Sequence, residues 1–282
     1  QKTNQISLYL TLYMMGLLLS GAVSFNMMAL YSNFRNGVFR REPPANVSME
    51  FSVHYVYPGF EQEDYFLIST LVNFYISYVC AFLICTMDLA LCLVIIQIIG
   101  HIRILAYNVR NFPKPQDVKE PQVFQHRNDN RPIMVKVVKM FDDQQNETIR
   151  KIITECIQHH LFIVNFTEDI SSFFGPMLAF NYLYHMFSFS LQLVVCMQGR
   201  DALIHYGPLT LMTLAQLTQL SVTFEIVATE SEKLIDEVYC VPWEAMSVSN
   251  QKSVGFLLKR LQTPIRVTAL GMMPVGVQTM AG

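Results

Sequence analysis

Residues 65–87 read YFLISTLVNFYISYVCAFLICTM, and none of these 23 side chains carries a charge. A helix needs roughly 20 mostly apolar residues to cross a membrane, because lipid offers backbone groups no partner except each other. The stretch therefore predicts a membrane-spanning helix, and the apolar run continues beyond Asp88 to residue 100.

Four other parts of the chain lack charge in the same way. They follow Lys2 (32 residues), Asp169 (30 residues), Asp201 (23 residues) and Arg266 (the last 16 residues). A buried core helix could explain one such run, but not five in one chain. The predicted spans are 7–33, 65–90, 172–198 and 203–224, with a truncated fifth from about 267.

The composition excludes several classes of protein. Of 282 residues, 52% are hydrophobic and only 15% are charged, whereas a soluble domain carries about 25% charged residues. Disorder would require low hydrophobicity and a high net charge. The net charge of −2 leaves no basic surface for nucleic acid, so we expect a membrane protein with no nucleic-acid partner.

Lysine and arginine are concentrated on one side of the predicted spans. Sixteen of the twenty lie before the first span or in segments 101–169 and 225–266, and four lie in loop 34–64 or at Arg200. Because positive charge favours the cytoplasmic side, both long segments are predicted to be cytoplasmic. Loop 34–64 is then outside, and Asn46, which begins an Asn-Val-Ser sequon, is a candidate glycosylation site.

The cytoplasmic segments carry helical periodicity. Apolar residues recur every three or four positions from Ile149 to Val164, and again within 231–262. Such faces need a partner, which assembly beneath the membrane would supply. We therefore predict an all-α fold, a polytopic membrane helical bundle whose long helices extend into a cytoplasmic region. Its expected parts are 1–100 (membrane helices with outer loop 34–64), 101–170 (cytoplasmic loop and helix), 171–224 (membrane helices), 225–266 (cytoplasmic helices) and 267–282 (start of a truncated helix).

The loops differ in expected order. Loop 34–64 contains four closely spaced aromatic residues, and aromatic side chains in a loop usually pack on something, so we expect an ordered lid. Residues 112–132 contain four prolines among polar residues, which predicts a flexible loop. The six cysteines offer neither an outer pair nor a CxxC spacing, so free, packed thiols are expected.

Two ionisable side chains lie within predicted spans, Asp88 and His185. Such groups are functional candidates in a membrane; alternatively, Asp88 reaches water or a neighbouring helix, and His185 is buried and hydrogen-bonded. His159 and His160 are adjacent, so they face different ways on a helix and metal ligation is not expected. No phosphate-binding, metalloprotease or nucleophile motif is present. We therefore expect no catalytic residue, no metal, no cofactor and no enzymatic activity.

The outer halves of the first two spans are rich in Met, Phe and Tyr, with a few amides and hydroxyls. Such a lining suits an apolar small ligand that polar groups orient, although the same residues also suit packing against lipid or other helices. The candidate ligand-binding residues are Phe25, Met28, Asn73, Phe74 and Tyr78.

Several short motifs resemble those of insect odorant receptors. They are Cys156-Ile157 with His160 before a Phe-rich span, Tyr239 with Pro242-Trp243, and Gln262-Thr263-Pro264 before the last span. Segment 264–280 is similar to the moth and butterfly sex-pheromone receptor subfamily. The resemblance extends over the whole chain, which would correspond to the family's third to sixth spans and part of the seventh. The chain is thus expected to be a fragment.

The resemblance implies a receptor rather than an enzyme. Members of this family have seven spans and a cytoplasmic N-terminus, and they assemble with a shared co-receptor into a hetero-tetrameric, ligand-gated cation channel. The resemblance also implies that the protein lies in the plasma membrane of olfactory sensory neurons and that its cytoplasmic helices form an anchor between subunits. The ligands that it implies are fatty-chain acetates, aldehydes or alcohols. The last span would line the pore, which makes Val275, Gln278 and Thr279 pore candidates by position.

Two other functions stay open on the sequence. A seven-helix G-protein-coupled receptor would have the opposite sidedness and DRY or NPxxY motifs, which this chain lacks. A transporter should show internal repeats, and none is visible.

Overall fold

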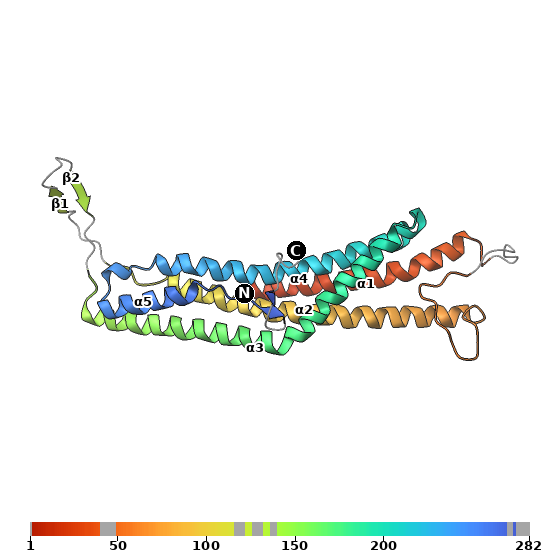
Figure 1. Cartoon of the computed structure of the whole chain (residues 1–282), viewed down its shortest axis with the longest axis horizontal. Helices are drawn as coiled ribbons and strands as arrows, with labels where there is room; N and C mark the ends of the chain where they lie inside the picture. The colour runs from red at the N-terminus through yellow and green to blue at the C-terminus, as the bar shows by residue number, and fades with distance from the viewer. Residues whose placement is uncertain are drawn as a thin grey trace. The chain divides into compact units, whose positions relative to one another are not determined.

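The computed structural model of the chain describes residues 2–39, 49–115, 122–125, 132–135, 140–269 and 273–274. Within these residues the structure is dominated by α-helices, which confirms the predicted all-α class (Figure 1). The helices are α1 (Lys2–Arg35), α2 (Phe66–Arg110), α3 (Asp143–Cys196), α4 (Arg200–Tyr239) and α5 (Val248–Leu261), with a 3-10 turn at Trp243–Ala245.

Two short strands lie within and directly after residues 112–132, which were predicted to be a flexible loop. Strand β1 (Gln122–Gln125) pairs antiparallel with β2 (Pro132–Val135), with Gln122 opposite Val135. The sequences QVFQ and PIMV contain β-branched and aromatic residues that favour strands, and a proline is tolerated at the first position of a strand. The proline count overstated the irregularity of this region, since proline limits pairing only at its own position.

The segment predicted to begin the last membrane helix is extended where it is described. Strands β3 (Thr268–Ala269) and β4 (Met273–Pro274) pair antiparallel, so the expectation of a helix from 267 is wrong for these four residues. Pro274 has no N–H to donate, and it restricts Met273 to extended conformations. Hydropathy predicted an apolar segment but could not reveal this backbone preference.

The chain divides into two compact units, which share the three longest helices. We call the described residues within 1–96 and 174–223 the first unit, and those within 97–173 and 224–275 the second unit. Each of α2, α3 and α4 therefore contributes one end to each unit. The boundaries expected from the charge pattern, after 100, 170 and 224, lie within four residues of these divisions.

Three helical segments of the described chain are long and apolar enough to cross a membrane: Gln5–Arg35, Phe66–Arg110 and Ala202–Ala245. They include three of the four complete spans that were predicted. The span predicted at 172–198 is not among them, although α3 is helical through Cys196. Its polar residues lower its hydropathy, so its place in the membrane stays a prediction.

The second unit has a core with the spacing of a coiled coil. Buried residues recur at three- and four-residue intervals on each of its helices, because this period keeps one stripe of a helix facing its neighbours. Most are apolar, but His160 of α3 and Ser231 of α4 each occupy one such position. The spacing confirms the amphipathic helix predicted at 149–164. The core includes Ile98, Ile102, Leu105 and Val109 of α2, Ile149, Ile153, Cys156 and Ile163 of α3, Phe224, Val227, Leu234 and Val238 of α4, and Val254, Leu257 and Leu261 of α5.

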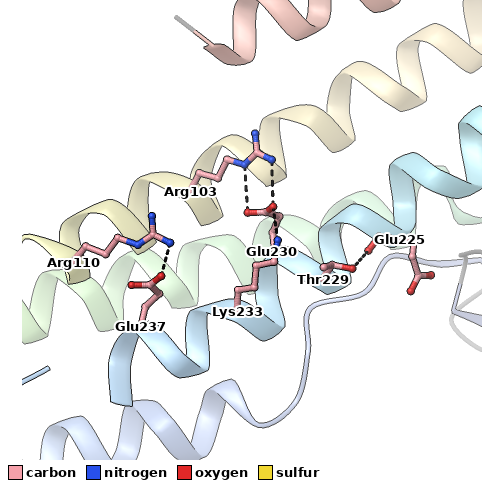
Figure 2. Close-up of polar contacts among 7 residues, drawn as sticks. All are labelled: Arg103, Arg110, Glu225, Thr229, Glu230, Lys233 and Glu237. Atoms are coloured by element: carbon pink, nitrogen blue, oxygen red, sulfur yellow. Dashed lines mark hydrogen bonds and ion pairs between the residues drawn. The ribbon is translucent and has the colours of Figure 1, made fainter. Parts of the chain in front are cut away.

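Ion pairs align α2 with α4 along the edge of this core (Figure 2). Arg103 donates to both carboxylate oxygens of Glu230 at 3.3 Å, and Arg110 pairs with Glu237. Both pairs advance by seven residues, so these parts of α2 and α4 run parallel and in one register. Lys233 also contacts Glu230, at 3.4 Å.

The first unit begins with α1 and the described part of the outer loop. Asn33 of α1 donates from Nδ2 to the Glu50 carbonyl (2.6 Å) and accepts the Glu50 N–H (2.7 Å). Within the loop, the rings of Tyr57 and Phe60 stack at 4.8 Å between centroids. The aromatic residues of the loop thus pack as expected of an ordered lid.

Candidate functional site

The first unit contains a cavity of about 330 Å³ among α1, α2, α3, α4 and the outer loop. This volume lies at the lower end of the range for small-molecule sites. Much of its wall is apolar and comes from three of the helices, and the apolar side chains include Leu17, Leu18, Phe25, Ile76, Ile84, Leu209 and Met212. Such a wall suits an apolar ligand, because its burial removes hydrocarbon from water.

Polar groups gather on the α3 and α4 sides of the same cavity. The Thr213 hydroxyl donates to Oε1 of Gln192 at 3.1 Å, which links α4 to α3. Gln216 of α4 donates from Nε2 to the Cys85 sulfur of α2 at 3.1 Å. Both amides line the cavity, so they could orient the polar end of a ligand. Further polar lining residues are Ser77, Tyr184, His185 and Ser188.

The outer loop contributes Val53 and Tyr55 to the cavity wall. The Val53 carbonyl accepts hydrogen bonds from Nδ2 of Asn73 (3.0 Å) and Nε2 of Gln62 (3.2 Å), and Gln62 accepts the Tyr55 N–H through Oε1 (3.0 Å). Gln62 and Asn73 are each only 2% exposed. The Asn73 amide therefore holds the loop against α2, the Gln62 amide fixes the loop internally, and the loop forms a lid on the cavity wall.

A buried polar cluster joins α2 to α3 beside the cavity. Asn181 donates from Nδ2 to Oδ1 of Asp88 at 2.6 Å, and Nε2 of His185 lies 3.2 Å from Oδ2 of the same carboxylate. Asp88 and His185 are 2% and 1% exposed. The expectation that Asp88 reaches a neighbouring helix and the expectation that His185 is buried and hydrogen-bonded are both confirmed.

His185 is only half satisfied. Its Nδ1 is buried and has no hydrogen-bond partner within the described part of the chain, and the residue lines the cavity. In the tautomer whose Nε2 donates to this carboxylate, Nδ1 of the neutral ring is an acceptor. The cavity wall thus includes an imidazole that is fixed by Asp88 through Nε2 and keeps its Nδ1 unpaired within the described residues.

The structure places the five predicted ligand-binding residues in different surroundings. Phe25 lines the cavity, whereas Asn73 holds the lid; Met28, Phe74 and Tyr78 are not part of the wall. Tyr78 is 41% exposed and stacks on Phe82. No ligand is present to test these assignments, so they stay predictions.

Sequence reasoning did not select the polar wall formed by Gln192, Thr213 and Gln216. The available signal was the presence of amides within otherwise apolar runs, since a buried amide needs a partner in lipid. His185 was selected as an ionisable side chain within a predicted span.

Other predicted positions lie outside the described residues. These are the glycosylation candidate Asn46 and the pore candidates Val275, Gln278 and Thr279. Among the residues that the structure describes, no group of three or more His, Cys, Asp or Glu side chains could hold a metal ion. All six cysteines are described and free, and Cys80 and Cys240 are exposed rather than packed.

Long apolar helices around a lidded, ligand-sized cavity are features of a helical membrane receptor. A model of the 7tm Odorant receptor family matches residues 2–281. The chain therefore belongs to the odorant receptor family, as its motifs indicated. No curated protein matches the sequence.

The fold is similar to that of solved receptors. Two structures of the insect olfactory receptor OR5 from Machilis hrabei, one of them in complex with eugenol, each match with a TM-score of 0.67 and 13% sequence identity. Each match covers 99% of this chain but 63% of the receptor. At this identity the likeness establishes the fold alone, and the chain spans less than two thirds of the receptors' length.

Proposed function

We propose that the chain forms the ligand-binding part of an odorant receptor subunit, and that the ligand occupies the cavity of the first unit. The subunit works with a co-receptor as a hetero-tetrameric, ligand-gated cation channel in the plasma membrane of olfactory sensory neurons. Its ligands are fatty-chain pheromones, namely acetates, aldehydes or alcohols. The single observation that carries the proposal is the lidded cavity in a chain of this family.

The cavity wall supports an apolar ligand with one polar end. Each buried CH₂ contributes about 0.8 kcal/mol, so the leucine, isoleucine and phenylalanine side chains favour long chains over short ones. Amides and hydroxyls on α3 and α4 would select the head group, because a buried polar group left without a partner is costly. The apolar part of the wall would thus select the ligand's chain length, and the polar part on α3 and α4 would select its head group.

Gating follows if the ligand binds one arrangement of the helices more tightly than the other. The cavity is lined by four helices and the lid, so a ligand inside it contacts every element of the described first unit. A change in their packing would alter its contacts, which provides the differential affinity that gating requires.

The test uses a pair of alanines on α2. Ala81 lines the cavity, whereas Ala90 is exposed and does not. The receptor that contains this chain is expressed with its co-receptor, and currents are recorded against a panel of fatty-chain acetates, aldehydes and alcohols. We expect Ala81→Phe to shift the half-maximal concentration upward by at least about tenfold, since a phenyl ring fills the site.

The matched control Ala90→Phe should respond as the native receptor does. Equal responses of the two variants, with equal surface expression, would exclude the cavity as the ligand site. If the native receptor is present at the surface but no compound of the panel evokes a current, the pheromone assignment is wrong.

A further inference from the structure

The second unit has its own cavity, of about 600 Å³, between α3 and the end of α5 with the segment that follows it. Its wall combines apolar side chains with an excess of basic ones. Lys259 and Arg260 of α5 and Arg266 beyond it supply three cations, and Glu168 of α3 is the one carboxylate in the wall. The balance of charge therefore favours an anion.

Two of these cations have no carboxylate partner within the described residues. Arg260 lies over the Phe256 ring, 5.5 Å from its centroid, and no ion pair engages Lys259. Arg266 contacts Glu232 only at 3.8 Å. Lys259 and Arg260 are thus available to an incoming anion.

A buried imidazole nitrogen without a partner points to the same conclusion. His160 of α3 lines the cavity and is 7% exposed, and its Nε2 has no hydrogen-bond partner in the part of the chain that the structure describes. A buried polar atom without a partner costs free energy. An anion oxygen that accepts a hydrogen bond from this ring would satisfy it, and the Thr167 hydroxyl lies in the same wall.

The position of the cavity along the chain favours a lipid. Glu168 lies four residues before the predicted span 172–198, which is about 6 Å along a helix. This span is predicted to begin at the cytoplasmic face. The cavity would then lie at the level of the lipid headgroups, where basic pockets bind phosphorylated headgroups.

We propose that this cavity binds a phosphate group, supplied by a phosphorylated lipid headgroup, between α3 and residues 259–266. Such a group would connect His160 on one wall with Lys259 and Arg260 on the other. It would tie α3 to the segment that leads towards the end of the chain. This site is independent of the odorant cavity and of its ligand.

The test measures binding to the purified chain in phosphatidylcholine nanodiscs, with and without phosphatidylinositol bisphosphate. Inorganic phosphate and inositol trisphosphate are the soluble probes. We expect the double variant Lys259→Gln/Arg260→Gln to weaken binding by about tenfold or more, because each charge-assisted hydrogen bond contributes substantially. Both side chains are exposed, so the variant should fold.

A matched control removes two charges elsewhere in the same unit. Lys151 of α3 and Lys252 of α5 are exposed and lie outside the cavity wall. The double variant Lys151→Gln/Lys252→Gln should change the dissociation constant by less than about twofold, since distant surface charges are screened. His160→Leu should weaken binding while the control variant does not.

The probes distinguish the source of the phosphate. Binding of the lipid with weaker binding of the soluble probes supports a headgroup, and equal binding of inositol trisphosphate supports a phosphate site that a soluble anion fills. The proposal is overturned if no probe binds. It is also overturned if the control pair weakens binding as much as the cavity pair, which would indicate only general attraction.

Discussion

The two units of this receptor chain are built from the same long helices but place their polar groups differently. In the first unit polar side chains are buried among helices, and large apolar side chains are exposed, such as Leu71 and Phe187 at 62% and 67%. In the second unit the enclosed core is mostly apolar, although His160 and Ser231 lie within it, and the ion pairs lie at the edge, with Arg103 44% exposed. One helix therefore changes its pattern along its own length.

The difference indicates two surroundings. Apolar side chains on all faces of a helix are stable only where lipid or protein surrounds it, and only 11% of the most apolar window of α1 is buried within this chain. In lipid, polar contacts between helices help to hold them together, since hydrocarbon offers no hydrophobic drive for association. In water, the apolar stripe provides that drive. Polar contacts between helices should therefore contribute most to the stability of the first unit, and apolar packing should contribute most to that of the second.

The largest expected effect is at the buried carboxylate of the first unit. Asp88→Ala leaves His185 and Asn181 without their shared partner, and removing one member of a buried pair costs about 3 kcal/mol or more. The free energy of unfolding in mixed micelles titrated with dodecyl sulfate measures this. Asp64→Ala, at an exposed loop position, is the control and should change it by less than about 0.5 kcal/mol. If both variants changed the free energy of unfolding equally, buried polar contacts would not be what holds the first unit together.

A second substitution pair probes the apolar core of the second unit. Ile102 is fully buried, whereas Ile104, two residues along α2, is 52% exposed. Ile102→Ala should destabilise the chain by about 3 kcal/mol, because it leaves a cavity in packed surroundings. Ile104→Ala should cost less than about 1 kcal/mol. If the exposed position proved as costly, that face of α2 would be covered by another subunit.

Acid should weaken the second unit through its histidines. Burial, and then the charge of Arg260, lowers the pKa of His160; burial, and then His101, lowers the pKa of His159. A lowered histidine pKa stabilises the folded chain above the ordinary value of about 6.5, and this stability is lost as the pH falls through the lowered pKa. We therefore expect the unfolding midpoint to decrease between about pH 7 and pH 5.

His160→Leu should reduce this decrease, whatever its effect at neutral pH. The measurement is the thermal midpoint of native chain and variant at both pH values. Arg260, Lys259, Arg266 and Glu168 face the same cavity. An unchanged decrease in the variant would assign the acid sensitivity to other groups.

The smallest effect is expected at the ion pairs of Figure 2. A double-mutant cycle of Arg103→Gln and Glu230→Gln should give a coupling free energy of about 0.5 kcal/mol, because Arg103 is largely solvated. The coupling should weaken in high salt. A coupling above about 2 kcal/mol would show that this edge is desolvated in the assembled receptor.

Local pattern predicted much of this fold. The absence of charge marked long apolar helices, and the three- and four-residue spacing marked the helix that contains Ile149. The helical periodicity noted within 231–262 ends where α5 ends, at Leu261, since Pro264 prevents its continuation. The short strands escaped prediction because a pair of strands depends on a partner distant in sequence as well as on composition.

The sequence by itself determined the class of protein, because hydropathy and periodicity are properties of neighbouring residues and the family motifs are short. Only the tertiary structure decided which polar residues meet. Asp88 and His185 are 97 residues apart, as are Ser171 and Thr268, and no spacing rule relates positions so distant. The sequence could not predict the cavity wall either, since residues from four helices and a loop form it. The hydrogen-bond partners and the cavity wall depend on how the helices pack, whereas the helices themselves depend on the residues along each segment.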